Sequence, residues 1–185
     1  MKEFKKQMIY ATMYLGDRAA GSQLMFNVPV GQPMPAMFGP EATCNHCGRY
    51  DRSPTQTAEH TNIQQAGQFG SAIGDVCLTS VQAKTSDGRE QRSSIDLASF
   101  SLRVCGRRVG CWTLSDLLGE PVPLPRIAVA RTDTFEGELA LPPGAVLKRP
   151  DKTSPLFVKI EFWADIGPEG EIALPGTYLK QGVPR

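Results

Sequence analysis

Two closely spaced cysteines are the first residues whose types and spacing could do chemistry. Cys44 and Cys47 are separated by two residues, and His60 follows Cys47 after twelve. Such a pair with a distant histidine supplies three of the four ligands of a structural zinc site. No second histidine follows within five residues of His60, so the zinc-finger pattern is incomplete. Cys44, Cys47 and His60 are therefore the candidate metal ligands, with zinc as the candidate ion. The pattern as a whole favours unligated thiols and no cofactor.

The remaining cysteines form no second knuckle, but a composite site of Cys44, Cys47, His60 and one further cysteine stays open. Cys105 and Cys111 have five residues between them, which is too many for a tight zinc knuckle. Cys77 lies in an apolar strand pattern, which predicts a core position. The total of five cysteines is odd, which favours a reduced chain over a disulfide framework. The pair Arg107 and Arg108 between Cys105 and Cys111 predicts a hairpin tip in preference to a phosphate site.

Motifs of enzymatic chemistry are missing from the sequence. It contains no glycine-rich phosphate loop and no G-x-S-x-G nucleophile elbow. Its two histidines give few candidates for a general base. We therefore predict no catalytic residue and no enzymatic activity. An enzyme on a β-barrel or cupin-like scaffold is a third hypothesis, and it would need a histidine cluster that the chain does not supply.

The elements that must carry these residues have the patterns of short strands. The chain contains 18 glycines and 15 prolines, which suit strands and turns better than helices. Residues 156–166 alternate strictly, with Val158, Ile160, Phe162 and Ala164 on one face and Lys159, Glu161 and Asp165 on the other. Further strands are predicted at residues 8–15, where a helix stays open, and at residues 22–30, 75–84, 93–104, 125–131 and 136–141.

Connections between these strands carry turn and helix signals. Asp87-Gly88 predicts a hairpin between the strands on either side of it. Residues 113–120 predict a short helix, with Thr113 or Ser115 as the cap and Gly119 near its end. Residues 45–72 are polar and poorly periodic, which indicates a long surface loop. Residues 137–144 and 170–176 resemble each other, a likeness too short for a repeat architecture.

Length and charge set further limits. The chain has 185 residues, enough for one domain, with 41% hydrophobic and 21% charged residues. The formal net charge is +1, so no strong field draws the chain to nucleic acid or to an anionic membrane. No apolar run approaches the roughly 18 residues of a membrane span. We predict a single β-sandwich domain over residues 1–185, with extended N- and C-terminal arms.

Short strands, Pro-Gly turns and extended arms together resemble the small jelly-roll subunits of icosahedral viruses, namely coat, pentameric vertex and decoration proteins. The resemblance implies an eight-stranded sandwich that assembles in rings. The expected fold class is an all-β, antiparallel, jelly-roll-like sandwich with one short helix and a long polar loop.

Two main functions follow as expectations. The first is a non-enzymatic structural subunit of a symmetric assembly, located in a virion and made in host cytoplasm. Its partners would be copies of itself and a larger protein shell. Tyr178 and Leu179 in the C-terminal arm would then anchor an inter-subunit contact, because aromatic anchors with a charged rim are usual at interfaces. The alternative is a small cytoplasmic β-module that is stabilised by zinc or binds a ligand.

Overall fold

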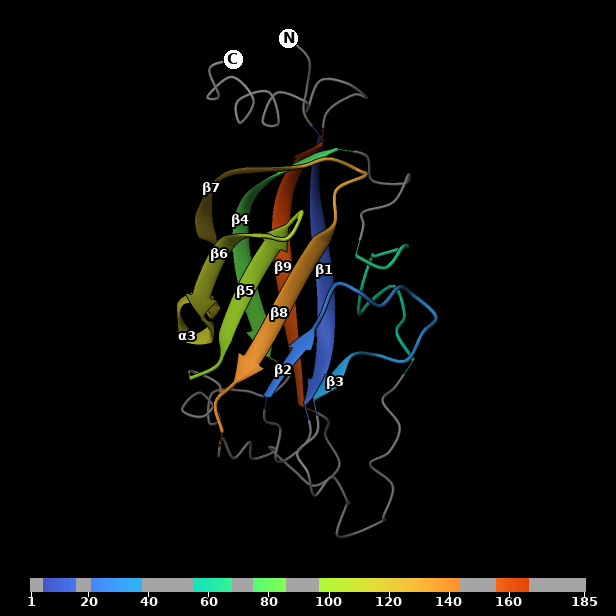
Figure 1. Ribbon diagram of the computed structural model, residues 1–185, viewed down its shortest axis with the longest axis vertical. Coiled ribbons are helices and arrows are strands. Elements are labelled where there is room, and N and C mark those ends of the chain that lie inside the picture. Colours follow the sequence, from blue (N-terminus) through green and yellow to red (C-terminus); the bar gives the residue numbers. More distant parts are fainter. Residues whose placement is uncertain are drawn as a thin grey trace, which may run out of the picture.

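The strands form two sheets that face each other (Figure 1). The computed structural model describes residues 5–15, 21–37, 55–67, 75–85, 97–143 and 156–166. Sheet A contains β1 (Lys5–Leu15), β3 (Ala36–Met37), β4 (Val76–Thr85), β7 (Val122–Val129) and β9 (Leu156–Ile166), in the order β3-β1-β9-β4-β7. Sheet B contains β2 (Gly21–Leu24), β5 (Ser99–Val104), β6 (Arg107–Thr113) and β8 (Phe135–Leu141), in the order β2-β8-β5-β6.

Apart from the two-residue β3, which joins β1 in parallel, the strands pair as one long antiparallel ribbon folded on itself. β1 pairs with β9, β2 with β8, β4 with β7, and β5 with β6. Pairing of β9 with β4 and of β8 with β5 then rolls the ribbon into a sandwich. This strand order is that of a jelly roll. The predicted all-β, jelly-roll-like fold class is therefore confirmed.

One predicted pairing is wrong. The Asp87-Gly88 signal predicted a hairpin between the strands before and after it, but β4 belongs to sheet A and β5 to sheet B. A turn signal is local, and it does not decide whether the two flanking strands share a sheet. The hairpin partner of β5 is β6, through the two-residue turn Cys105-Gly106, whose φ angles are 48° and 74°. Positive φ at both positions is typical of the tight turns that match strand twist. The predicted hairpin is present, but its tip is Cys105-Gly106, and Arg107 and Arg108 are the first residues of β6.

The core between the sheets is built around four phenylalanines. Phe26, Phe100, Phe135 and Phe162 are all buried, and the Phe26 ring centroid lies 5.1 Å from that of Phe135 and 5.8 Å from that of Phe162. Gly137 on β8 leaves room for two of these rings. A Cβ atom there would lie 2.5 Å from the Phe26 ring and 2.9 Å from the Phe100 ring. The interior of the sandwich is therefore filled by side chains.

Sequence periodicity predicted most of these elements. β1, β4, β7, β8 and β9 correspond to predicted strands, and β1 is a strand where a helix was also open. In β9 the predicted inward row of Val158, Ile160, Phe162 and Ala164 is buried, and Cys77 on β4 is buried as predicted. The strand predicted at residues 22–30 ends at Leu24, five residues before Pro29.

The short predicted helix is present as α3 (Leu114–Leu117), with Thr113 as its cap. The Thr113 side chain accepts a hydrogen bond from the Asp116 backbone N–H, and Leu114 and Leu117 are buried. The helix is shorter than predicted because Leu118 takes an extended conformation and forms a bridge with Ala83 on β4. Among the described helical residues, no helix is long and apolar enough to cross a membrane.

Candidate functional site on the outer face of sheet A

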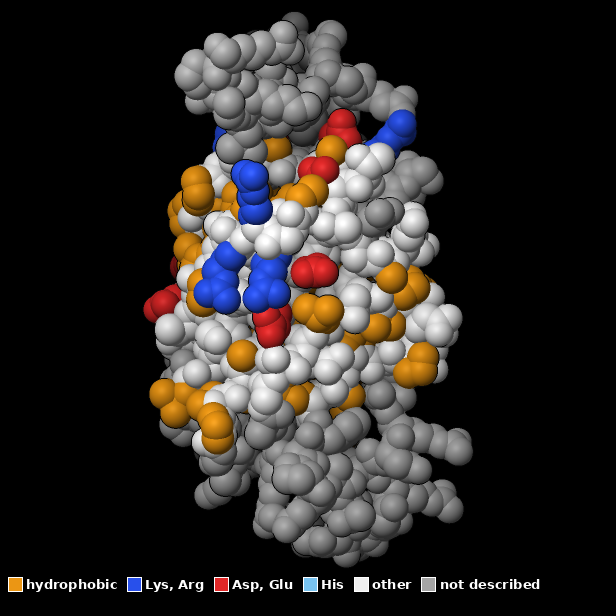
Figure 2. Space-filling model, in the orientation of Figure 1, with side chains coloured by type: hydrophobic (Ala, Val, Ile, Leu, Met, Phe, Trp, Pro, Cys, Tyr) orange, Lys and Arg blue, Asp and Glu red, His pale blue; other side chains and the backbone are white. Residues whose placement is uncertain are grey.

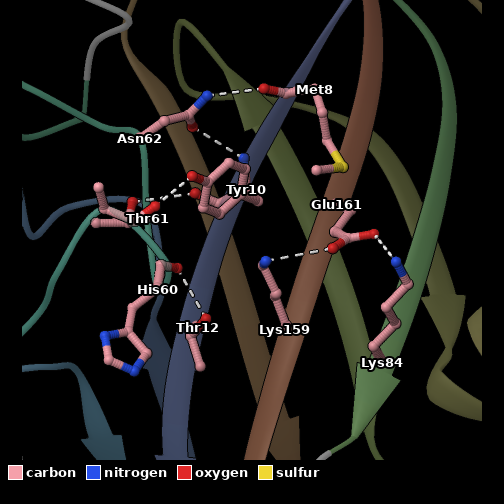
Figure 3. Close-up of polar contacts among 10 residues, drawn as sticks. Met8, Tyr10, Thr12, His60, Thr61, Asn62, Lys84, Lys159 and Glu161 are labelled. Carbon is pink, nitrogen blue, oxygen red and sulfur yellow. Dashed lines mark hydrogen bonds and ion pairs between the residues drawn. The ribbon is translucent and has the colours of Figure 1, made fainter.

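The first part of the site is a polar segment that covers the free edge of β1. Residues 55–67 come from the predicted surface loop, and Asn62 hydrogen-bonds β1 like a neighbouring strand (Figure 3). Its Oδ1 accepts from the Tyr10 backbone N–H at 3.0 Å, and its Nδ2 donates to the Met8 carbonyl at 2.7 Å. The Thr61 hydroxyl donates to the Tyr10 carbonyl at 3.0 Å. These side chains satisfy backbone groups of β1 that would otherwise be open to another chain.

His60, the candidate metal ligand in this segment, has a local structural role. Its Nδ1 accepts a hydrogen bond from the Thr57 backbone N–H at 3.1 Å, and its carbonyl accepts one from the Thr12 hydroxyl at 2.8 Å. Its ring lies 6.1 Å from the Phe157 ring. An Nδ1 that accepts a hydrogen bond leaves the proton of a neutral imidazole on Nε2. Nδ1 also lies 2.9 Å from the Thr57 hydroxyl, so both of its contacts are to Thr57.

The other candidate ligands, Cys44 and Cys47, lie outside the described residues, as do Tyr178 and Leu179. Within the described ranges, no three His, Cys, Asp or Glu side chains come together as a metal site. The zinc site and the C-terminal contact therefore both stay predictions.

The centre of the site is Glu161, whose burial the sequence did not reveal. Alternation placed it on the solvent face of β9, and it does point outward, yet only 2% of the residue is exposed. Its carboxylate lies 2.5 Å from Lys84 Nζ and 3.4 Å from Lys159 Nζ (Figure 3). The contact with Lys84 is an ion pair without regular hydrogen-bond geometry at Oε2. β9 is the central strand of sheet A, so neighbours on both sides cover this carboxylate.

These neighbours are set by strand register. Glu161 is opposite Tyr10 on β1 and opposite Gln82 on β4. The Lys159 ammonium lies 4.2 Å from the centroid of the Tyr10 ring, a distance at which a cation is attracted to the aromatic face. One carboxylate thus meets two ammonium groups, which leaves a positive charge at the surface. A pattern of alternation shows which way Glu161 points, but it does not show which strands flank β9.

Tyr10 is held in its neutral form. Burial raises the pKa of its hydroxyl, and the negative charges of Glu161 and Glu59 raise it further. The hydroxyl donates a hydrogen bond to the Ala58 carbonyl. At neutral pH this phenol is a hydrogen-bond donor and an apolar surface, and it is not a general base.

The site ends at an exposed tryptophan. Trp163 is opposite Met8 on β1, and 39% of it is exposed. An exposed indole beside charged side chains is typical of a contact surface. We define the sheet A contact face as Met8, Tyr10, Lys84, Lys159, Glu161 and Trp163. These residues offer ring surfaces, fixed charges and no nucleophile paired with a base.

Sheet B carries a second set of charges and two exposed thiols. Arg103 on β5 lies 3.7 Å from Glu138 on β8. Cys105 and Cys111 are exposed and free. Burial raises the pKa of the Cys105 thiol, and the hydrogen bond and charge of Asp133 raise it further. Because the thiolate is the reactive form, a raised pKa makes Cys105 a poor nucleophile.

Comparisons with family models, with curated proteins and with solved structures give no match to this chain.

Proposed function

We propose that this chain is a non-enzymatic structural subunit of a symmetric assembly, of the kind that virions build from coat, vertex or decoration proteins. The observation that carries the proposal is the filled interior of the jelly roll. Phe26, Phe100, Phe135 and Phe162 occupy the space between the sheets, where a barrel that holds a ligand needs a cavity.

With the interior filled, the outer surfaces are left to carry function. The sheet A contact face combines a partly exposed Trp163 with fixed charges at Glu161, Lys84 and Lys159. A partly exposed aromatic ring beside charged side chains is common at protein interfaces. Such a face supports contact with another subunit better than turnover of a substrate.

Native mass spectrometry and sedimentation velocity of the purified chain test this proposal together. We expect discrete oligomers whose population rises with protein concentration, and a mass without bound metal. A chain that stays monomeric at every concentration, with and without shell proteins from the same source, would contradict the assembly. Stoichiometric zinc that survives dialysis would instead support the zinc-stabilised module.

Two surface substitutions test whether the sheet A contact face contributes to self-association. Trp163→Ser removes an exposed ring and should shift the oligomer distribution toward monomer. Leu97→Ser is the matched control, because Leu97 is 70% exposed and lies outside the defined face. It should leave the distribution unchanged.

A further inference from the structure

The sandwich has four outer edges, and three of them are blocked against strand addition. The edge of β1 is covered by β3 and by the side chains of Thr61 and Asn62. β7 contains Pro123 and Pro125, which have no N–H to donate. β2 has only four residues. β6 has seven residues, and within the described part of the chain no strand pairs with its outer side. An unpaired strand of this length is a template for another strand.

Charge at this edge is unbalanced. In the register of sheet B, Glu136, Arg103 and Arg108 form a row across β8, β5 and β6. Figure 2 shows basic side chains gathered over this part of sheet B, with acidic ones beside them. Arg103 lies near Glu138, whereas no acidic side chain in the described ranges lies within ion-pair distance of Arg107 or Arg108. The next strand outward would therefore favour acidic residues on its outer face.

The inner side of the same edge is apolar and only partly covered. Val109 and Trp112 on β6 pack against the core but stay partly exposed. The Trp112 ring stacks on Phe100 at 6.1 Å between centroids. A strand added beside β6 would bury more of both side chains if its inner face were apolar.

The sequence contains a segment with both required faces. Residues 169–174, EGEIAL, repeat β8 residues 136–141, EGELAL, with one Leu-to-Ile difference. In β8 the two glutamates and Ala140 point outward, while Gly137, Leu139 and Leu141 point inward. The same pattern in residues 169–174 puts Glu169 and Glu171 on the outer face and Ile172 and Leu174 on the inner face.

We propose that residues 169–174 of one copy add to sheet B of a second copy, along the free edge of β6. Main-chain hydrogen bonds would supply affinity, and the outward-facing Glu169 and Glu171 would lie beside Arg108. Arg108 shares the outer face with Arg103, whereas Arg107 is paired with the buried Val104 and lies on the inner face. The inference rests on the proposed assembly function and names its contact.

The same chain cannot reach its own β6. Only Gly167 and Pro168 lie between Ile166, the end of β9, and Glu169, which allows about 10 Å of extended chain. The Phe162 ring of β9 lies 6.0 Å from the Phe100 ring of β5 between centroids, so β9 lies over the middle of sheet B. Measured from β9, a strand added beyond β6 lies about two strand spacings to the side and one sheet spacing across. The combined distance is roughly 14 Å. The occupant is therefore a second copy.

A charge-swap experiment on the full chain tests this contact by sedimentation velocity and native mass spectrometry. We compare the wild type, Arg108→Glu, Glu169→Lys/Glu171→Lys and an equimolar mixture of the two variants. Glu120→Lys is the control, because it reverses a charge at an exposed position outside this contact and outside the sheet A contact face. Each contact variant should weaken self-association by roughly tenfold or more, as the loss of close charge pairs at interfaces does. The mixture should restore association, and the control should match the wild type.

A peptide-binding titration tests strand addition to β6 independently of whether the full chain assembles. A labelled peptide of residues 167–176 is titrated into the Glu169→Lys/Glu171→Lys chain, beside a peptide with Lys in place of both glutamates. Binding of the acidic peptide, with weaker binding of the Lys peptide, supports strand addition even for a chain that is monomeric by itself. If neither peptide binds, or if the variants associate like the wild type, the proposed contact is wrong while an assembly through another surface still stands.

Discussion

At the scale of single residues, Glu161 has the most unusual environment in the described structure. A carboxylate that is 2% exposed depends on Lys84 and Lys159 for compensation of its charge. Glu161→Gln removes that charge and leaves two ammonium groups facing each other. We expect a loss of about 1–2 kcal/mol in the free energy of unfolding, below the range for fully buried pairs because Lys84 is half exposed.

Urea denaturation measures this loss. Glu138→Gln serves as the control, since that side chain is 27% exposed and pairs with Arg103 at 3.7 Å. Its cost should stay below about 0.5 kcal/mol. Equal costs for both substitutions would mean that the buried carboxylate has no special importance for stability.

Tyr10 gives the described structure a dependence on alkaline pH. Its folded pKa is raised above 10.0 by burial and by nearby negative charge. The native state therefore holds the phenol proton more tightly than the unfolded chain. The resulting stability is fully present below the unfolded pKa and is lost as pH rises through the folded pKa.

Thermal unfolding at a pH below and a pH above this range checks the effect in the wild type and in Tyr10→Phe. The wild type should lose more stability between the two values than the variant does. Phenolate absorbance should show one tyrosine that titrates late, and it should be missing from Tyr10→Phe. A spectrum with no late tyrosine would rule out this source of alkaline sensitivity.

At the scale of elements, the positions of the strands were more predictable than the pairing between strands. Period-two alternation in β8 and β9 reports one buried face, and that face is the same whichever strand lies alongside. Pairing depends on contacts between residues far apart in sequence, which is why the Asp87-Gly88 hairpin prediction was wrong and why β9 could not be recognised as the central strand. The cover on β1 was missed for the same reason. Asn62 and Thr61 have no periodicity, and their function comes only from the edge they meet.

That cover makes a prediction for Asn62. Asn62→Ala removes the acceptor for the Tyr10 N–H and the donor to the Met8 carbonyl. Two lost hydrogen bonds at a partly buried edge should cost about 1–3 kcal/mol. Hydrogen exchange at the Tyr10 amide should accelerate, which would localise the effect to β1. Thr57→Ala, in an exposed turn of the same segment, should change neither quantity by as much.

At the scale of the whole molecule, the many short, half-buried strands with turn residues predicted an all-β sandwich, and the jelly-roll topology was expected from the resemblance to virion subunits. The candidate site was predicted less well. The sequence drew attention to Cys44, Cys47 and His60, residue types with known chemistry. The sheet A contact face instead consists of ordinary residues that strand register brings together, and register is not visible in a single sequence.

The C-terminal arm gives the prediction at this scale. Deleting residues 177–185 removes Tyr178 and Leu179 but keeps residues 169–174. If the two residues anchor an inter-subunit contact, the deletion weakens assembly in sedimentation velocity, while the monomer's unfolding temperature changes little. A truncated chain that fails to fold would place the arm in the core of the subunit. Unchanged assembly would remove Tyr178 and Leu179 from the interface.

The pairing of β1 with β9 has a consequence for how the protein is made. These strands join residues 5–15 to residues 156–166, and β9 also separates β1 from β4. During synthesis, sheet A therefore has no central strand until residues 156–166 have left the ribosome. Contacts so distant in sequence make folding slow, and unpaired strands are prone to aggregate while they wait. Residues 55–67 emerge about a hundred residues before β9 and hydrogen-bond the other side of β1. The cover on β1 can then act as an early partner that shields the strand until β9 arrives.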